Sequence, residues 1–344
     1  MKLISLSGSH YEIGYCHGKA LAGEINSFYD LFLGKLAQRD VSMETSLDIV
    51  KKLGKCIEKY TPDLLEEVRG IADGSKMEYE SVLSLNCLFE IPRIAGRTEM
   101  HYCTIWGVID GRKCLAVQNL DLASEYGEFL TLFRISPAEK ESVLLQAMPG
   151  MVGMLGMNGN GLVFSGTTVS SREASYGLPK PFISRTILHN CDNVIDAAKI
   201  LQNFPRTTGG NPLLADARGG LMVLECSAIK CAVLHPDKGY VASTNHYTDD
   251  ELFGLSPPDT ESSKARLGRI NWLLEHAKDR DLDEMFSFAR DHEHSPDNLT
   301  ICRHGSISTV SSLVFIPSER CIWIASGSPC STPFQQYYVN KTDS

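Results

Sequence analysis

The chain has 344 residues, of which 43% are hydrophobic and 22% are charged, and these proportions are typical of soluble globular proteins. Its formal net charge is -9 at pH 7 and it has no cluster of Lys and Arg, so we expect no nucleic-acid partner. No apolar run approaches the length of a bilayer span or of a signal peptide. We therefore expect a cytoplasmic protein without a membrane partner, built as one large domain or as one domain with a helical appendage.

The eleven cysteines are scattered and odd in number, and they include no C-x-x-C pair. This pattern is typical of reduced thiols and predicts neither a disulfide framework nor a zinc site. The densest group of metal-binding residue types is Asp291-His292-Glu293-His294, which lacks the H-E-x-x-H spacing of zinc enzymes and precedes Ser295-Pro296-Asp297. We expect a solvated loop there, and no metal.

The first hundred residues predict a short strand followed mostly by helices. Apolar residues recur at helical spacing over residues 11–36, 42–60, 62–72 and 80–88. From Tyr102 onward the pattern changes to short β-branched and apolar runs separated by Gly, Pro and Asn. These runs predict an antiparallel sheet with strands at residues 103–108, 113–117, 129–135, 142–146 and 162–168.

Helical and strand patterns alternate again in the rest of the chain. Two helices are predicted over residues 181–189 and 194–203, followed by strands at residues 212–217, 220–226, 231–235 and 240–243. After a polar stretch over residues 248–263, helices at 264–276 and 282–289 precede strands at 311–316, 321–325 and 334–339. This order of elements predicts an α+β protein built in layers.

Cys103 opens the first of the predicted sheet strands, and we consider it as a nucleophile. A thiol is a weak nucleophile until a base accepts its proton, and a free α-amine with a pKa of about 8 on the same residue can do so. That amine exists only if the Tyr102-Cys103 bond is cut. The cysteine itself can cut it by attacking the Tyr102 carbonyl to form a thioester, which water hydrolyses. The alternative is that Cys103 is a small buried hydrophobe.

Two further polar residues are candidates for the same site. Asp121 follows Cys103 by eighteen residues, as expected if one hairpin returns the chain beside the nucleophile, so its carboxylate could orient the new ammonium. The alternative for Asp121 is a turn or cap aspartate. Asn245 lies just after the strand at 240–243 and offers an uncharged amide donor for an oxyanion, or it is a turn former. His246 beside it is a supporting residue.

Other candidates are individually weaker. The turn Gly156-Met157-Asn158-Gly159-Asn160-Gly161 leads into a strand and not a helix, so it does not predict a dinucleotide site, but its amides could supply a second oxyanion donor. A plain hairpin is the alternative. Arg303 offers a cation for a substrate carboxylate or for Asp121. Asn119 could bind the adjoining backbone.

Several short motifs occur in a fixed order: GSHYEIGYCHG from Gly8, RGIADG from Arg69, Leu85-Asn86, Cys103-Thr104, Asn119-Leu120-Asp121, Gly156-x-Asn158-x-x-Gly161, Thr244-Asn245-His246, Ile301-Cys302-Arg303 and Gly327-Ser328-Pro329-Cys330. Together they resemble the acyl-CoA:6-aminopenicillanic acid acyltransferase family of autoprocessing cysteine hydrolases, whose relatives include β-alanyl-dopamine and carcinine hydrolases. The resemblance covers nearly the whole chain.

The resemblance implies an N-terminal-nucleophile hydrolase with an αββα four-layer sandwich and a helical N-terminal segment. It implies a precursor cut into a light chain, residues 1–102, and a heavy chain, residues 103–344, which stay together as one globular unit. The implied reaction is amide hydrolysis or acyl transfer through a thioester on Cys103. The substrate would be a small acyl amide or acyl thioester, with no cofactor, although an acyl-CoA could be a co-substrate. The implied catalytic residues are Cys103, Asp121 and Asn245, and the supporting ones are Thr104, Asn119, Asn158, His246 and Arg303.

The chain departs from the penicillin-forming members at two positions. Tyr102 stands where those members have glycine before the nucleophile, and Ile307-Ser308-Thr309 stands where they have an arginine. We therefore expect a different substrate. Two alternatives stay open: an amidase like bile-salt or penicillin-V hydrolases, which expose their cysteine after losing a very short leader, or an unprocessed, non-catalytic small-molecule-binding protein. The oligomeric state is left open.

Overall fold

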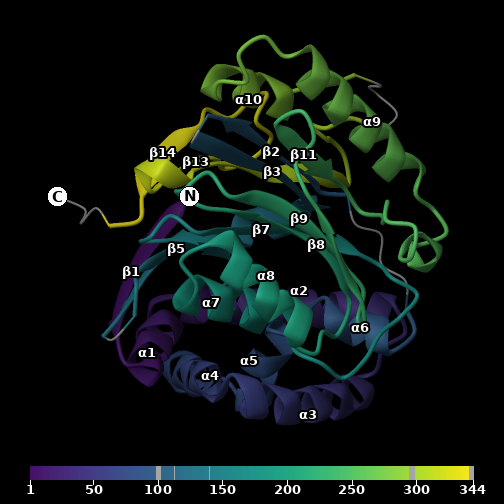
Figure 1. Cartoon of the computed structure of the whole chain (residues 1–344). Coiled ribbons are helices and arrows are strands. Elements are labelled where there is room, and N and C mark those ends of the chain that lie inside the picture. Colours follow the sequence, from purple (N-terminus) through teal and green to yellow (C-terminus); the bar gives the residue numbers. More distant parts are fainter. Residues whose placement is uncertain (98–101, 112, 139, 294–298, 341–344) are drawn as a thin grey trace.

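The computed structural model describes residues 1–97, 102–111, 113–138, 140–293 and 299–340. His294 and Ser295-Pro296-Asp297, part of the expected solvated loop, lie outside these ranges. Two β-sheets pack face to face at the centre of the molecule, and helices cover the outer face of each (Figure 1). The expected α+β sandwich of four layers is confirmed. Within the described ranges, no helix has the length and apolar character needed to cross a bilayer.

The larger sheet has eight strands in the order β1-β4-β5-β6-β7-β8-β9-β10. Their bounds are β1 (Lys2–Gly8), β4 (Thr131–Pro137), β5 (Val143–Ala147), β6 (Leu155–Asn158), β7 (Val163–Val169), β8 (Gly209–Ala215), β9 (Leu221–Cys226) and β10 (Cys231–Leu234). The first strand pairs in parallel with β4, while the other neighbours are antiparallel. The first residues of the chain are thus an integral part of this sheet.

The smaller sheet has six antiparallel strands in the order β11-β2-β3-β12-β13-β14. Their bounds are β2 (Thr104–Asp110), β3 (Lys113–Ala123), β11 (Tyr240–Ser243), β12 (Ile307–Ile316), β13 (Cys321–Ala325) and β14 (Gln335–Tyr338). Successive side chains of a strand point to opposite faces of its sheet. In β2, Ile105 therefore joins the core between the sheets, whereas Trp106 and Val108 pack under the outer helices.

Helices cover both outer faces of the sandwich. Helices α9 (Glu261–His276) and α10 (Leu282–Ala289) lie over the smaller sheet, and α7 (Lys180–Asn190) and α8 (Val194–Asn203) over the larger one (Figure 1). The N-terminal segment adds α1 (His10–Ala20), α2 (Ala22–Gln38), α3 (Met43–Tyr60), α4 (Pro62–Ser75), α5 (Tyr79–Leu85) and α6 (Glu90–Ile94) on the same side as α7 and α8. Short 3-10 helices occupy Ser124–Phe129, Phe253–Leu255 and Pro317–Glu319.

Several elements differ from the sequence-based expectation. Strand β3 continues to Ala123, beyond the predicted strand at 113–117, so Asn119 and Asp121 lie within it, and β8 and β12 begin before their predicted starts. The helical pattern over residues 11–36 contains a break, because the buried Leu21 leaves the helical region of backbone angles and separates α1 from α2. Strand β6 was expected to be part of a turn. All four of its residues are buried, so no alternation of apolar and polar residues marks it as a strand, and only the turn after it has the expected form.

Glycines allow helices α1 and α4 to pack with their backbones in contact. A Cβ atom on Gly14 of α1 would lie 2.0 Å from the carbonyl oxygen of Glu67, and one on Gly70 of α4 would lie 2.2 Å from that of Tyr11. Gly18 and Gly74 repeat this arrangement one turn further along. Both glycine pairs fall within the two N-terminal motifs of the resemblance, which therefore encode a close helix crossing.

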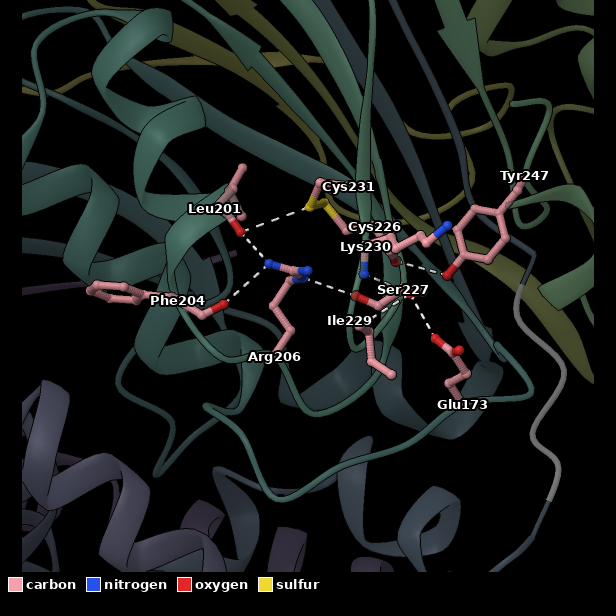
Figure 2. The surroundings of a disulfide bond; sticks show 10 residues. All are labelled: Glu173, Leu201, Phe204, Arg206, Cys226, Ser227, Ile229, Lys230, Cys231 and Tyr247. Carbon is pink, nitrogen blue, oxygen red and sulfur yellow. Dashed lines mark hydrogen bonds between the residues drawn. A yellow bond between two sulfur atoms is a disulfide. The ribbon is translucent and has the colours of Figure 1, made fainter. Parts of the chain in front are cut away.

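The prediction that all the cysteines are reduced was wrong for one pair. Cys226 and Cys231 form a disulfide across β9 and β10 (Figure 2). The two residues lie directly opposite each other in the antiparallel ladder, with their Cα atoms 4.2 Å apart. Ser227 closes the turn between them by donating its backbone N–H to the carbonyl oxygen of Lys230 at 2.8 Å. Only the register of the two strands reveals this pairing, because a spacing of five residues is no disulfide signature.

Candidate active site

Cys103 lies immediately before β2, and its thiol faces the space between the two sheets. It is 6% exposed, and its Sγ donates to the carbonyl oxygen of Asp121 at 3.8 Å. It lines a mostly apolar pocket together with Gln118, Leu120 and Leu122 of β3. Those residues alternate along β3, so they mark the inner face of the smaller sheet. The predicted nucleophile thus opens onto a buried pocket.

The carboxylate of Asp121 lies on the opposite face of the same sheet. The ladder pairs Thr104 with Asn119, which brings Asp121 beside the backbone at the start of β2. Its Oδ1 accepts a hydrogen bond from Thr309 Oγ1 at 2.7 Å, and Thr309 is its partner on β12. Its Oδ2 is buried and has no hydrogen-bond partner among the described residues. The Asp121 carboxylate and the Cys103 thiol therefore lie on opposite faces of the sheet, near the start of β2.

Arg266 links the backbone at Cys103 to Asn245, and the sequence-based interpretation missed it. This fully buried arginine of α9 donates from Nη1 to the carbonyl oxygen of Cys103 at 2.6 Å and to Thr104 Oγ1 at 3.0 Å. Its Nη2 donates to Asn245 Oδ1 at 3.0 Å. A signal was present, because Ser263, Arg266, Ile270 and Leu274 share the buried face of a helix at spacings of three and four residues.

Asn245 follows β11 and is held in one orientation. Its Oδ1 accepts from Arg266, and one of its two side-chain N–H groups donates to the carbonyl oxygen of Thr168 at 2.8 Å. The Ser263 hydroxyl accepts from the backbone N–H of Asn245 at 2.8 Å and lies 2.7 Å from His246 Nδ1. His246 therefore supports the segment that carries Asn245.

Of the other expected site residues, Arg303 lies near Asp121 and Asn158 does not lie at the site. The guanidinium carbon of Arg303 lies 4.2 Å from the centre of the Tyr102 ring, and its Nη1 donates to Ser262 Oγ at 2.9 Å. Asn158 instead ties β6 to the C-terminal end of α7, because its Nδ2 donates to the carbonyl oxygens of Leu188 and Cys191. Its Oδ1 accepts backbone N–H groups of the turn after β6, which forms the plain hairpin.

Asn119 fastens a long loop to the smaller sheet. Its Nδ2 donates to the carbonyl oxygens of Ala289 and Ile301 at 2.9 and 3.0 Å, and its Oδ1 accepts from Ser312 Oγ at 2.7 Å. The hydrogen bonds of its side-chain amide are therefore made to two backbone carbonyl groups and to a hydroxyl of the neighbouring strand β12. Asn119 therefore shapes the loop that carries Arg303 and does not face the pocket.

Burial dominates the electrostatics of the site. It raises the pKa of the Cys103 thiol to about 12, and the charge of Asp121 acts in the same direction. Burial also raises the pKa of Asp121 to about 7, opposed by Arg266, by the Thr309 hydrogen bond and by Arg303. Burial and the cations of Lys264 and Arg266 lower the pKa of His246 to about 4. In the uncut chain the thiol is therefore protonated at neutral pH, and His246 is uncharged.

The pocket beside Cys103 has polar groups at a few positions of its apolar wall. Gln118 accepts a hydrogen bond from the backbone N–H of Gly166 at 2.9 Å, while its Nε2 has no partner among the described residues. The hydroxyls of Thr207 and Thr208, which also line the pocket, likewise have no hydrogen-bond partner among the described residues. Buried polar groups without partners are costly, so they favour a ligand that supplies hydrogen bonds within an apolar cavity.

Residues 110–331 match the family model described as acyl-coenzyme A:6-aminopenicillanic acid acyl-transferase. The chain belongs to this family. The matched residues include Asp121, Asn245, Arg266 and Arg303, whereas Cys103 lies before their start.

Two relatives and one solved structure illustrate the similarity of this acyltransferase-family chain. It is 24% identical over 313 residues to the 40 kDa form of acyl-coenzyme A:6-aminopenicillanic-acid-acyltransferase from Emericella nidulans, covering 87% of this chain and 84% of the relative. It is 27% identical over 329 residues to an uncharacterized protein of Archaeoglobus fulgidus, covering 79% of this chain but only 54% of the relative, so it spans about half the length of that protein. The structure of penicillin V acylase from Agrobacterium tumefaciens superposes with a TM-score of 0.52 at 16% identity, covering 70% of this chain and 87% of that one. This likeness shows the N-terminal-nucleophile hydrolase fold.

Proposed function

We propose that this family member is an autoprocessing cysteine amidohydrolase or acyltransferase that acts on N-acyl amines or acyl thioesters through a thioester on Cys103. The observation that supports this most strongly is the placement of the proposed nucleophile and the proposed carboxylate on opposite faces of the smaller sheet. The Cys103 thiol faces the apolar pocket, while the Asp121 carboxylate lies on the other face of the sheet, near the start of β2. A nucleophile that uses its own α-amine as base needs this arrangement.

The α-amine arises when the chain cuts itself before Cys103. The Sγ attacks the Tyr102 carbonyl carbon, and the carbon–sulfur bond forms as the bond to the Cys103 nitrogen breaks and that nitrogen takes up a proton. Water then hydrolyses the thioester to a Tyr102 carboxylate and a free thiol. Arg266 holds the carbonyl oxygen of Cys103 and Arg303 lies over the Tyr102 ring, so both sides of the bond are held in position.

The freed α-amine then activates the thiol for turnover. It accepts the thiol proton, and the resulting ammonium donates to Asp121 Oδ2, the oxygen that has no partner among the described residues of the uncut chain. The thiolate attacks the substrate carbonyl, and the second side-chain N–H of Asn245 stabilises the oxyanion. The leaving amine or thiol departs with a proton from the ammonium. Water or an acceptor amine takes the acyl group from the thioester and restores Cys103.

The pocket favours an acyl group with a largely apolar body. Its wall combines aliphatic, aromatic and methionine side chains with the polar atoms of Gln118, Thr207 and Thr208, and the cationic residues Lys180 and Arg206 also line it. An acyl-CoA is a possible donor, because its thioester has the same reactive carbonyl. The proposal requires no cofactor.

The intact mass under denaturing conditions tests the proposal. We expect two fragments, of 102 residues and of the remaining 242, and a single uncut chain for Cys103→Ala. Cys114→Ala is the matched control, because Cys114 is another buried thiol of the same sheet whose pKa burial raises to about 12, and this variant should still be cut.

The processed protein is then screened with N-acyl amines and acyl thioesters. Turnover that Cys103→Ala abolishes and Cys114→Ala keeps would support the proposal. An uncut chain that still hydrolyses amides through Cys103 would remove the α-amine mechanism and leave a simple thiol hydrolase. An uncut chain without thiol-dependent turnover would favour the non-catalytic binding protein, for which the buried, protonated thiol of the uncut chain is the supporting observation.

A further inference from the structure

Four side chains outside the proposed active site converge on one point. They are His292, which follows α10, Cys302 and His304, which precede β12, and Cys330, which lies between β13 and β14. The ligand atoms of all four lie within 4.8 Å of one another. Two imidazoles and two thiols from three separate segments thus meet at the surface, in a set of residue types that is typical of zinc sites. The proposed reaction uses none of them.

The three distances from His304 to the other ligand atoms are close to the edges of a tetrahedron around one metal ion. Zinc binds nitrogen at about 2.0 Å and sulfur at about 2.3 Å, so tetrahedral edges are about 3.3 Å between two nitrogens and about 3.6 Å between nitrogen and sulfur. His292 Nε2 and His304 Nε2 are 3.0 Å apart. His304 Nε2 lies 3.7 Å from Cys302 Sγ and 3.5 Å from Cys330 Sγ. Each of these three distances is close to the expected edge length.

The surrounding contacts position the segments that carry the ligands. Asp291 makes two hydrogen bonds with Arg269, at 3.1 and 2.6 Å, and its carbonyl oxygen accepts the backbone N–H of Cys302 at 3.0 Å. The Arg290 side chain donates to the carbonyl oxygen of Pro329 at 3.1 Å, which brings the Cys330 turn to the same place. Supporting contacts that orient the ligands are a general property of metal sites in proteins.

We propose that His292, Cys302, His304 and Cys330 bind one Zn²⁺ ion in a four-coordinate structural site. Two thiolates balance the charge of the ion, and four protein ligands leave no position for substrate, which distinguishes a structural site from a catalytic one. The ion would join the loop between α10 and β12 to the β13–β14 turn. Because Arg303 lies between two of the ligands, the same ion would fix the backbone that carries Arg303 near Tyr102 and Asp121.

The sequence-based interpretation expected no metal, and the spacing of these residues explains why. The ligands follow the pattern H-x9-C-x-H-x25-C, which is unlike the paired spacings of zinc fingers or H-E-x-x-H enzymes. A long loop and a pair of strands bring them together. The site is therefore visible only in the folded chain.

Metal analysis of the full-length protein, purified under reducing conditions and reconstituted with Zn²⁺, tests the proposal. We expect about one zinc ion per chain in the wild type and loss of at least nine-tenths of it in Cys330→Ser and His304→Ala. Cys330 is exposed, so its replacement removes a ligand without disturbing the core. Cys16→Ser, which alters another exposed thiol, should keep the zinc.

A second readout reports on the ligands themselves. With Co²⁺ in place of zinc, the wild type should show the intense visible absorption of tetrahedral cobalt together with a sulfur-to-cobalt charge-transfer band, and Cys330→Ser should lose the charge-transfer intensity of one thiolate. A chelator should lower the thermal midpoint of the wild type and leave that of Cys330→Ser unchanged.

Two outcomes would overturn the zinc site. One is zinc binding to the reduced wild type that does not exceed that of Cys330→Ser. The other is a Cys302–Cys330 disulfide in peptide mapping of protein kept under reducing conditions. The uncut Cys103→Ala variant should bind zinc as the wild type does, so failure of the proposed catalysis and failure of the zinc site are distinguishable.

Discussion

At the scale of single residues, burial controls both groups on which the proposed reaction depends. It raises the pKa values of the Cys103 thiol and of the Asp121 carboxyl in the uncut chain, to about 12 and about 7. A buried, protonated thiol is a poor nucleophile toward external substrates. Cutting the chain would place an ammonium beside Asp121, which favours the carboxylate and lowers its pKa. The uncut precursor is therefore expected not to turn over external substrates until it is processed.

The raised pKa of Asp121 has a measurable effect on the stability of the uncut chain. The unfolded chain loses this proton near pH 4, whereas the folded chain keeps it until about pH 7, so folding stability falls as the pH rises through this window. We expect Cys103→Ala to lose about 4 kcal/mol more than Cys103→Ala/Asp121→Asn between pH 4 and pH 8. Chemical denaturation of both variants at several pH values measures the difference.

Equal pH dependence of the two variants would show that Asp121 is already ionised in the uncut chain. The processed wild type is an internal comparison. Its ammonium should stabilise the Asp121 carboxylate, so the loss of stability with rising pH should shrink or disappear.

At the scale of elements, the α1–α4 crossing shows how small residues fix the position of a helix. The close approach allowed by Gly14 and Gly70 brings Glu67 of α4 to α7, where its carboxylate accepts two hydrogen bonds from Arg185, both at 3.1 Å. His10 of α1 lies 3.0 Å from the same carboxylate. Glu67 and Arg185 are both fully buried, so removing either one would leave the charge of the other buried and uncompensated.

Replacing a glycine at this crossing should separate the helices. A Cβ on Gly70 would meet the backbone of α1 at 2.2 Å, which no change of rotamer relieves. We expect Gly70→Ala to lower the free energy of unfolding by about 3 kcal/mol. Denaturant unfolding, in the uncut Cys103→Ala background, provides the measurement.

Gly34→Ala is the matched control, because Gly34 lies inside α2 with nothing within 4 Å of the added Cβ. It should stabilise the protein by about 1 kcal/mol, since alanine favours helix. Equal effects of the two substitutions would mean that the close crossing of α1 and α4 does not contribute to stability.

At the scale of the whole molecule, the segment before the proposed cut is built into the fold that it precedes. It supplies β1 to the larger sheet and Glu67 to the ion pair with Arg185. The side chain of Asn86 accepts the backbone N–H of Val152 and donates to the carbonyl oxygen of Gly150, both at 2.8 Å. These contacts cross between the proposed light and heavy chains, so cutting one peptide bond leaves them in place.

The two fragments should therefore remain together after processing. We expect them to co-elute in size-exclusion chromatography under native conditions and to separate only in denaturant. Arg185→Met should destabilise the processed complex by about 3 to 5 kcal/mol, because it leaves the Glu67 carboxylate buried and unpaired. Lys199→Met, which removes an exposed ion pair with Asp196, should change its stability by less than about 1 kcal/mol. Fragments that separate without denaturant would contradict this expectation.

Hydrophobic periodicity and residue chemistry are local properties, so the order and type of most elements and the candidate nucleophile could be predicted from the amino-acid sequence. Helices such as α8 and α10 and strands such as β11 and β13 have the predicted bounds. The order of short motifs was enough to indicate the family and its layered fold. The roles of Cys103, Asp121 and Asn245 in the reaction stay predictions.

The contacts between side chains that lie far apart in the sequence could be seen in the folded chain alone. Arg266 reaches the backbone of Cys103 across 163 positions of the chain, and Asp121 meets Thr309 across 188. The Cys226–Cys231 disulfide depends on strand register, and the proposed zinc ligands depend on the packing of two loops. Such contacts are set by the packing of whole elements against one another. A local pattern carries no information about which element will lie opposite. The spacing of Arg266 with Ile270 and Leu274 marks one face of α9, but not what that face will meet.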